Sequence, residues 1–312
     1  MPQAHRSSLL SAALSAAERG WAVFPLVPGD KRPALHSERR CPGTGVCVDG
    51  HRMPEQRATT DPARIARCWD HAPYNIGVAA GPSGLVVVDL DVPKGPDDLP
   101  PADGDTPGAR DGSGVFAALC GRHGQEYPGD TYTVRTVSGG THLYYAAPDG
   151  IELRNTAGKL GWKVDTRAHG GYVVGAGSVL TGKAASYTAV HEAPVAPLPG
   201  WLADLLRPAP LPPQKPVTVA LAAERRGKWL QAAVNGELER VATSPAHEHN
   251  NALYLASVAL GQLVAGGALA EEQVTGWLTD AALRVGQKEP EARRTVASGL
   301  RAGARRPRAV AA

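Results

Sequence analysis

The stretch "GLVVVDLDV", residues 84–92, joins an apolar run to two aspartates. The preceding glycines and proline predict a turn, and the Leu and Val residues predict a buried strand. Side chains two residues apart on a strand point to the same face, so we expect Asp89 and Asp91 side by side. An unpaired buried carboxylate is costly, and two neighbouring carboxylates repel each other. A divalent cation between them is one remedy. The alternative is a solvated or capping pair at a strand end.

The composition indicates a globular protein of one large or two modest domains. The chain has 312 residues, is 43% hydrophobic and carries a net charge of +3, which permits nucleic-acid binding without requiring it. The first twenty residues alternate apolar and charged positions, which predicts an amphipathic helix with Leu9, Leu10, Ala13 and Leu14 on one face rather than a signal peptide. No apolar run reaches membrane-spanning length. We therefore expect a cytoplasmic protein with no membrane partner, whose four cysteines bind metal or lie buried instead of forming disulfides.

Turn signals and apolar patterning predict a β-rich first part. Strands are expected near 21–27, 74–81 and 84–92, with helices from residue 60, capped by Thr60 or Asp61, and over 114–124. A hairpin is expected over 131–147, turning at "SGG" (138–140). A second pair of strands is expected over 161–180, turning at "AHGG" (168–171).

The composition changes after this part. We expect a first domain over residues 1–206, a linker over 207–223 that is stiffened by five prolines in residues 207–216, and a small all-helical domain over 224–306. Helices are expected over 224–241, 247–266, 270–286 and 290–303. The final stretch, residues 288–308, holds seven Lys or Arg against two Glu. It predicts either a solvated face or a nucleic-acid contact.

Two further groups of residues suit phosphate chemistry. In "TVSGGTHLYY", glycines let backbone amides approach a ligand closely, and a hydroxyl and an imidazole lie beside them at Ser138 and His142. An ordinary Gly-Gly hairpin with an exposed histidine is the alternative. In "GWKVDTRAHGGYVV", Asp165 precedes Arg167 by two positions on a short strand. This is either a third carboxylate of a metal site or a surface ion pair.

The order of these motifs resembles the archaeo-eukaryotic primase superfamily. A D-x-D strand, an S-G-G-x-H strand and a strand with a single aspartate follow one another as "VVVDLDV", "VSGGTHLYY" and "KVDTRAHGGYVV". More narrowly, they resemble the bifunctional DNA primase/polymerase domain of plasmid, phage and actinobacterial replication proteins. The flanking "GWAVFPLVPGDKRPAL", "ATTDPARI" and "NIGVAAGPSGLVVVDLD" resemble it too, so the similarity covers about residues 17–205. The helical part is more weakly similar to C-terminal domains attached to such primases.

The resemblance implies an α+β fold, with an antiparallel-sheet catalytic core similar to an RNA-recognition fold and a helical C-terminal domain. It implies a DNA primase or DNA polymerase that transfers nucleotides from NTP or dNTP on a DNA template, in replication of a plasmid, phage or integrated element. Two Mg²⁺ or Mn²⁺ ions would be held by Asp89, Asp91 and Asp165. A phosphate grip would be formed by Ser138, Gly139, Gly140 and His142. Three basic residues would add positive charge near the phosphates or template, or else are solvated: Arg167, Lys31 and Arg32.

A second metal site is a candidate in "HSERRCPGTGVCVDGH", residues 36–51. His36, Cys41, Cys47 and His51 are ligand types that suit tetrahedral Zn²⁺, although their spacing matches no common finger signature. Cys68 is a rival fourth ligand, and unligated loop side chains are the alternative. Zinc-bearing insertions occur in primases of the superfamily that the chain resembles. Cys120, in an apolar helix, is expected to be buried.

Other functions remain open from the sequence alone. "GSVLTGKA" (177–184) approximates a phosphate-binding loop, but an alanine stands at position 184 and no helix is expected after it, so we expect a separate replicative helicase as partner. One alternative is a replication-initiation or DNA-binding accessory protein with an inactive polymerase-like core. Another is a different nucleotidyltransferase or a phosphoesterase that uses the same aspartates. The presence of all three aspartates and His142 favours an active enzyme.

Overall fold

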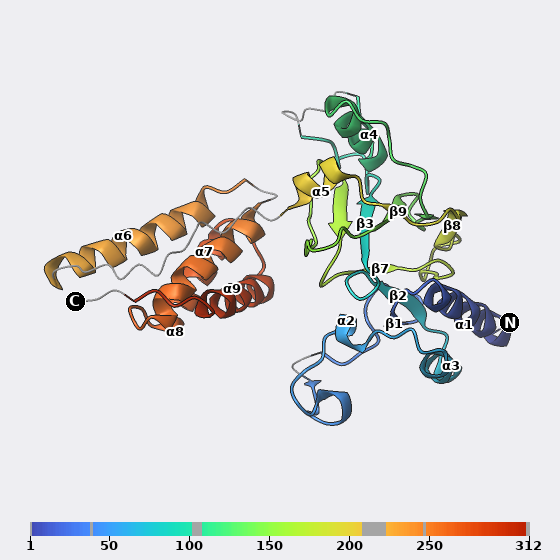
Figure 1. Cartoon of the computed structure of the whole chain (residues 1–312), viewed down its shortest axis with the longest axis horizontal. Coiled ribbons are helices and arrows are strands. Elements are labelled where there is room, and N and C mark those ends of the chain that lie inside the picture. Colours follow the sequence, from blue (N-terminus) through green and yellow to red (C-terminus); the bar gives the residue numbers. More distant parts are fainter. Residues whose placement is uncertain (1, 38–39, 102–107, 208–222, 246–247, 310–312) are drawn as a thin grey trace. The chain divides into compact units, whose positions relative to one another are not determined.

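The computed structural model describes residues 2–37, 40–101, 108–207, 223–245 and 248–309 (Figure 1). It divides into two compact units, Met1–Pro208 and Ala209–Ala312. Residues 208–222, which make up nearly all of the expected linker, lie outside the described residues.

The described part of the first unit contains two sheets. The smaller sheet has the strand order β1 (Val23–Leu26), β2 (Asn75–Ala79) and β7 (Tyr172–Val174). The larger sheet has the order β6 (Val164–Arg167), β3 (Leu85–Leu90), β5 (Thr141–Ala146), β4 (Thr133–Arg135) and β8 (Thr188–His191). These neighbours pair antiparallel, and the short β9 (Ala196–Pro197) pairs parallel with β5. The mixed α+β class with antiparallel sheets is confirmed.

The strand β3 is buried on both faces, which explains its continuous apolar run. Leu85 and Val87 belong to one hydrophobic core, which also includes residues of the smaller sheet. Val86, Val88 and Leu90 belong to a second core on the opposite face. A strand with cores on both sides cannot alternate apolar and polar residues. Asp89 is therefore an exception within a buried strand.

Helices cover the two cores from opposite ends of this unit (Figure 1). Residues of α1 (Pro2–Glu18) and α3 (Pro62–His71) pack into the first core, and residues of α4 (Gly112–Arg122) and α5 (Gly200–Leu206) into the second. The expected apolar face of α1 is confirmed, because Leu9 and Ala13 are buried. Asp61 caps α3 by accepting hydrogen bonds from two backbone N–H groups. A 3-10 turn, η2 (Gly45–Cys47), and the short α2 (Pro54–Arg57) lie between β1 and α3 in sequence.

One expected pairing is wrong. Both strands expected in 161–180 exist, but they do not pair with each other, because β6 pairs with β3 and β7 pairs with β2. The "AHGG" turn therefore carries the chain from one sheet to the other. Glycines at a turn allow the chain to change direction, but they do not determine which strand pairs with which. The edge of β3 is available, and β6 pairs there. The hairpin over 131–147 is confirmed as the pair β4 and β5.

The described part of the second unit is helical, as expected. It contains α6 (Ala223–Ala242), α7 (His249–Ala265), α8 (Glu271–Arg284) and α9 (Glu289–Ala304) around its own apolar core. The helices α7 and α9 approach closely at glycines. A Cβ added at Gly299 would lie 2.3 Å from the Cβ of Ser257, and one added at Gly261 would lie 2.8 Å from the Cα of Leu300.

Among the described residues, no helix combines the length and the apolar character needed to span a bilayer.

Candidate functional site

Three motif residues face one another on neighbouring strands of the larger sheet. On β3, Asp89 is the register partner of His142 on β5 and of Asp165 on β6. Residues directly opposite on antiparallel strands have Cα atoms about 4.5–5.5 Å apart and side chains on the same face. The three motifs, which lie far apart in the sequence, therefore converge.

The side chains of this group contact one another. His142 Nε2 lies 3.3 Å from Asp89 Oδ1. Arg167, two residues after Asp165 on β6, places Nη2 3.0 Å from Asp165 Oδ2 and 3.9 Å from Asp89 Oδ2. The other oxygen of Asp165 accepts a hydrogen bond of 3.0 Å from the N–H of Gly158. The Asp165–Arg167 ion pair, which the sequence left open as the alternative to a metal-binding carboxylate, is therefore present, and it lies within the carboxylate group.

Asp89 is held ionised by its neighbours. Its side chain is only 15% exposed, and burial alone would raise its pKa. The hydrogen bond and charge of His142, followed by the charges of Arg167 and Lys31, outweigh burial and lower the pKa of Asp89 below its usual value.

Asp91 has the opposite electrostatic character. Burial raises the pKa of its carboxyl group, and the nearby carboxylates of Asp89 and Asp165 raise it further. Its backbone is fixed, because its N–H donates to the Lys163 carbonyl at 2.9 Å and its carbonyl accepts from the N–H of Gly112 at 2.8 Å. The charges of Lys31 and Lys94 oppose this rise without cancelling it, and a divalent cation would relieve the repulsion between the neighbouring carboxylates.

The ligand oxygens of the three carboxylates do not all gather within 4.8 Å, so this acidic group is wider than a preformed metal site. Among the described residues, the His/Cys group described below is the only set of three or more ligand side chains that gathers within 4.8 Å. Arg167 reaches between Asp89 and Asp165 instead. Carboxylate oxygens suit Mg²⁺ or Mn²⁺, and these ions keep waters and substrate oxygens among their ligands, so a wide acidic group fits them.

The "SGG" turn lies beside the acidic group. A Cβ added at Gly140 would lie 2.6 Å from the Leu90 carbonyl oxygen and 3.5 Å from the Asp91 Cα, so only glycine allows this approach. Gly139 has a φ of 95° and is exposed, as is Ser138. The turn is thus near the carboxylates, but the Ser138 hydroxyl is on the solvent side.

A buried nitrogen of His142 has no partner. The side chain is 6% exposed, yet its Nδ1 finds no hydrogen bond among the described residues. An unpaired buried polar atom is costly, and a hydrogen bond to this nitrogen would remove that cost.

A cavity of about 380 Å³ opens at this face. Asp89, His142 and Arg167 line it, and its volume is that of a small-molecule site. Lys31 also lines it, whereas Arg32 is exposed and pairs with Asp30. Several lining residues had not been predicted: Asn155, Gly170, Gly171, Tyr172, Val173, Val174 and Tyr187.

The missed residues come from loops and from the other sheet. Asn155 Oδ1 accepts the N–H of Ala168 at 2.8 Å, and the Tyr172 hydroxyl donates to the Lys31 carbonyl at 3.1 Å. Tyr172 lies within the quoted "KVDTRAHGGYVV" motif, so the motif itself was a usable signal. Asn155 lies in a segment without apolar periodicity and gave no signal.

The sequence matches the family described as bifunctional DNA primase/polymerase, N-terminal, over residues 13–201. The chain belongs to this family. The matched segment includes both sheets and all three aspartates, and the resemblance inferred from the motifs is confirmed. The primase/polymerase family indicates an enzyme of the nucleotidyltransferase type that acts on DNA and nucleotides, and its members generally use divalent metals. No curated protein matches the chain.

A second candidate metal site lies within the primase/polymerase domain, away from the carboxylates in sequence. One ligand atom each from His36, Cys41, Cys47 and His51 lies within 4.8 Å of the others. The ligand atoms of a tetrahedral Zn²⁺ are about 3.3–3.8 Å from one another. Small shifts of these four side chains would therefore bring their ligand atoms to the distances that Zn²⁺ requires. Cys68 on α3 is outside this group, and Cys120 is buried in α4 as expected.

Two of these side chains have pKa values that favour metal-binding forms. The hydrogen bond from the Arg52 N–H, followed by those from Cys41 and Arg57, lowers the pKa of the Cys47 thiol against the effect of burial. Burial, followed by the charge of Arg57, lowers the pKa of His36. Thiolate and neutral imidazole are the forms that bind Zn²⁺.

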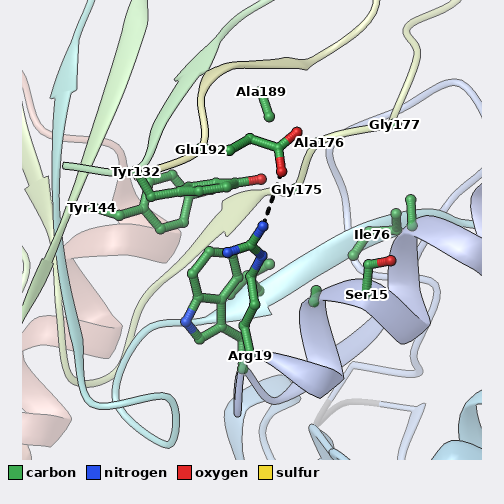
Figure 2. Close-up of a pocket in the computed structure, with 14 residues that line it drawn as sticks. Ser15, Arg19, Ile76, Tyr132, Tyr144, Gly175, Ala176, Gly177, Ala189 and Glu192 are labelled. Carbon is green, nitrogen blue, oxygen red and sulfur yellow. Dashed lines mark hydrogen bonds and ion pairs between the residues drawn. The ribbon is translucent and has the colours of Figure 1, made fainter. Parts of the chain in front are cut away.

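The primase/polymerase domain has a second hollow of about 240 Å³, shown in Figure 2. Trp21, Tyr132 and Tyr144 line it, and Arg19 pairs with Glu192 at 3.1 Å across it. None of the residues singled out from the sequence lines it.

Proposed function

We propose that residues 1–206 form the catalytic domain of a template-dependent DNA primase/polymerase. The observation that carries the proposal is the register of Asp89 with Asp165 and His142 on one face of the larger sheet. Asp91 follows two residues later, and the cavity beside the group has room for a nucleotide. The family supports the general activity, and this geometry supports the assignment of roles.

The acidic residues are assigned to metal binding. Asp89, Asp91 and Asp165 would hold Mg²⁺ or Mn²⁺, which fits the burial and the two neighbouring carboxylates that raise the pKa of Asp91. When bound, such ions lower the pKa of the primer 3′-hydroxyl and neutralise the triphosphate. The carboxylates fix where that charge lies, which is the main contribution a polymerase makes to the rate.

The other residues are assigned to the nucleotide. The unpartnered Nδ1 of His142 supports a hydrogen bond to a phosphate oxygen. The turn would offer the backbone N–H of Gly140, with the exposed Ser138 hydroxyl nearby, whereas the N–H of Gly139 already donates to the Thr136 carbonyl at 3.0 Å. Arg167 brings a positive charge to the cavity wall, where it would face the triphosphate.

A primer-extension assay tests the proposal. The full chain is supplied with primed template, NTP or dNTP, and Mg²⁺ or Mn²⁺. The double variant Asp89→Ala, Asp91→Ala should lose extension by about 10²–10³-fold or more while still binding DNA. The matched control is Asp204→Ala, because Asp204 is an exposed carboxylate on α5 that pairs with Arg207.

The alternatives give different results. Wild-type protein that binds DNA but never extends a primer would be an accessory protein with an inactive core. Nucleotide or phosphoester hydrolysis without dependence on template would indicate a phosphoesterase or another nucleotidyltransferase.

We also propose a structural Zn²⁺ at His36, Cys41, Cys47 and His51, supported by the gathering of their ligand atoms. Elemental analysis of the purified full chain should find one zinc per chain. The variant Cys41→Ser should lose it, and Cys68→Ser, at the rival position, should keep it. The opposite pattern would make Cys68 the ligand.

We propose that the helical domain, residues 224–306, contacts the template. Arg294, Arg301 and Arg305 are exposed on α9 and its C-terminal end at helical spacing, so they share one side of the helix. The double variant Arg301→Ala, Arg305→Ala should weaken DNA binding. It should also reduce the slope of the logarithm of the binding constant against the logarithm of salt concentration by up to about two units. An unchanged slope would leave these arginines as a solvated face.

A further inference from the structure

The short helix α2 lies in sequence directly after the His/Cys group. It begins at Pro54, three residues after His51, and ends at Arg57. Its two charged side chains make contacts in different places. Arg57 contacts the His/Cys group, and Glu55 contacts the loop between β6 and β7.

The Arg57 contacts are direct. Its Nη2 donates to His36 Nε2 at 2.6 Å and to Cys47 Sγ at 3.1 Å. The N–H of Arg52, just before α2, also donates to Cys47 Sγ at 3.4 Å. The position of α2 is therefore tied to the side chains that form the candidate zinc site.

The Glu55 contacts fix a loop. Its Oε1 accepts a hydrogen bond of 3.0 Å from the N–H of Gly170 and lies 3.9 Å from His169 Nδ1. The Glu55 side chain is 17% exposed, although the hydrogen bond itself lies at the surface, where Gly170 is exposed. Gly81 leaves room for it, because a Cβ at Gly81 would lie 2.0 Å from Glu55 Oε1.

The loop that Glu55 holds forms part of the catalytic cavity. Gly170 and Gly171 line this cavity together with Asp89 and Arg167. The loop follows β6 directly, and β6 carries Asp165. It then leads to β7 in the other sheet, so its position affects both walls of the cavity.

We propose that Glu55 is a positioning residue that couples the metal state of the His/Cys group to the shape of the nucleotide cavity through α2. Zn²⁺ would fix the four ligand side chains and would take the lone pair of His36 that Arg57 now uses, while Arg57 would keep its hydrogen bond to the Cys47 sulfur. The helix α2 would then be held at the metal site through Arg57, and Glu55 in turn holds the Gly170 amide. The inference rests on the proposed function in two respects: it takes the cavity as the nucleotide site and the His/Cys group as a Zn²⁺ site.

Hydrogen exchange in the full chain tests the coupling without any assay of activity. Removing zinc with a chelator should speed exchange of the 166–174 segment in wild type. Glu55→Ala should show the fast exchange with zinc still bound and should respond little to the chelator. Glu55→Gln keeps an acceptor oxygen and should behave as wild type. Glu152→Ala is the matched control, because Glu152 lies 3.8 Å from the other nitrogen of His169 but is largely exposed.

Nucleotide kinetics provide the second measurement. Glu55→Ala should raise the KM for the incoming nucleotide about tenfold with little change in kcat, which is the effect of one lost charge-assisted hydrogen bond. Zinc removal should raise KM in wild type by a similar factor and add little in Glu55→Ala. Gly81→Ala, whose Cβ would crowd both Glu55 Oε1 and His169 of the loop, should raise KM at least as much as Glu55→Ala does.

The outcomes separate this inference from the proposed function. The coupling would be overturned if hydrogen exchange of the 166–174 segment changed neither on zinc removal nor in Glu55→Ala. It would also be overturned if the purified chain held no metal at the His/Cys group. Coupled exchange in a protein that never extends a primer would support the coupling and refute the polymerase activity.

Discussion

At the scale of single residues, Asp89 and Asp91 are alike in type and opposite in electrostatic environment. Asp89 has cationic neighbours that lower its pKa, whereas Asp91 has carboxylate neighbours and burial that raise its pKa. A group with a lowered pKa stabilises the fold when ionised, and a group with a raised pKa destabilises it. Removing the charge of Asp89 and removing the charge of Asp91 should therefore change the stability of the fold in opposite directions.

We predict that, without divalent metal at neutral pH, Asp91→Asn raises the melting temperature and Asp89→Asn lowers it. The pKa of Asp91 is higher in the folded chain than in the unfolded chain. Its ionisation as pH rises through the carboxyl range therefore lowers the free energy of unfolding. The stability from Asp89 is present above its unfolded pKa and is lost as pH falls through its lower folded pKa.

Thermal melts of both variants with and without Mg²⁺ measure this. Mg²⁺ should stabilise wild type and have a smaller effect on either variant, because each has lost a proposed ligand. Equal destabilisation by both substitutions in the absence of metal would contradict the assigned environments.

The sequence predicted some of the site's residues and missed others for a physical reason. Asp89, His142 and Asp165 each lie in a strand-like segment with a recognisable motif, and sheet register then brings them together. Glu55 and Asn155 make hydrogen bonds to loop residues that lie 115 and 13 positions away in the sequence, respectively. Such contacts leave no periodic pattern in the sequence. Contacts of this kind are set by packing and not by local preference.

At the scale of elements, the sequence predicted which strands exist better than it predicted their partners. The strands β6 and β7 were expected as a hairpin, but each pairs in a different sheet. Alternation and turn residues report local conformation, while partner choice depends on which sheet edges are free and which faces must be buried. The helix α4 was predicted from its apolar residues, but its role in fixing Asp91 was not.

We predict that Gly112→Ala impairs both stability and activity. Gly112 is the first residue of α4, and a Cβ there would lie 2.2 Å from the Lys163 carbonyl oxygen and 2.9 Å from the Asp91 nitrogen. The backbone must move, at a cost of about 1–3 kcal/mol. A displacement of about 1 Å at Asp91 can reduce the rate about 10²-fold.

Gly121→Ala in the same helix is the matched control. A Cβ at Gly121 would have no neighbour within 4 Å, so the substitution should add up to about 1 kcal/mol of stability through helix propensity. Urea unfolding and primer extension of the two variants measure the difference. Normal activity of Gly112→Ala would show that Asp91 does not depend on the position of α4.

At the scale of the whole molecule, the apolar cores follow the division into units. The two cores of the first unit are drawn from residues 9–206, and the core of the helical unit from residues 229–300. The family match ends at residue 201, so the helical unit lies beyond it. A unit with its own core can unfold as its own cooperative step, and a chain with two such units need not be two-state.

We predict that Gly299→Ala lowers only the unfolding transition of the helical unit. The added Cβ would lie 2.3 Å from the Cβ of Ser257 on α7 and 2.9 Å from the Tyr254 carbonyl oxygen, so α7 and α9 must separate at a cost of about 1–3 kcal/mol. Gly276→Ala on α8, whose Cβ would meet nothing within 4 Å, is the control. Calorimetry of the full chain should also show the transition of the first unit. Gly299→Ala should leave its melting temperature unchanged, and Gly112→Ala should lower it. A single transition that both substitutions shift equally would mean that the two units unfold together, so that each stabilises the other.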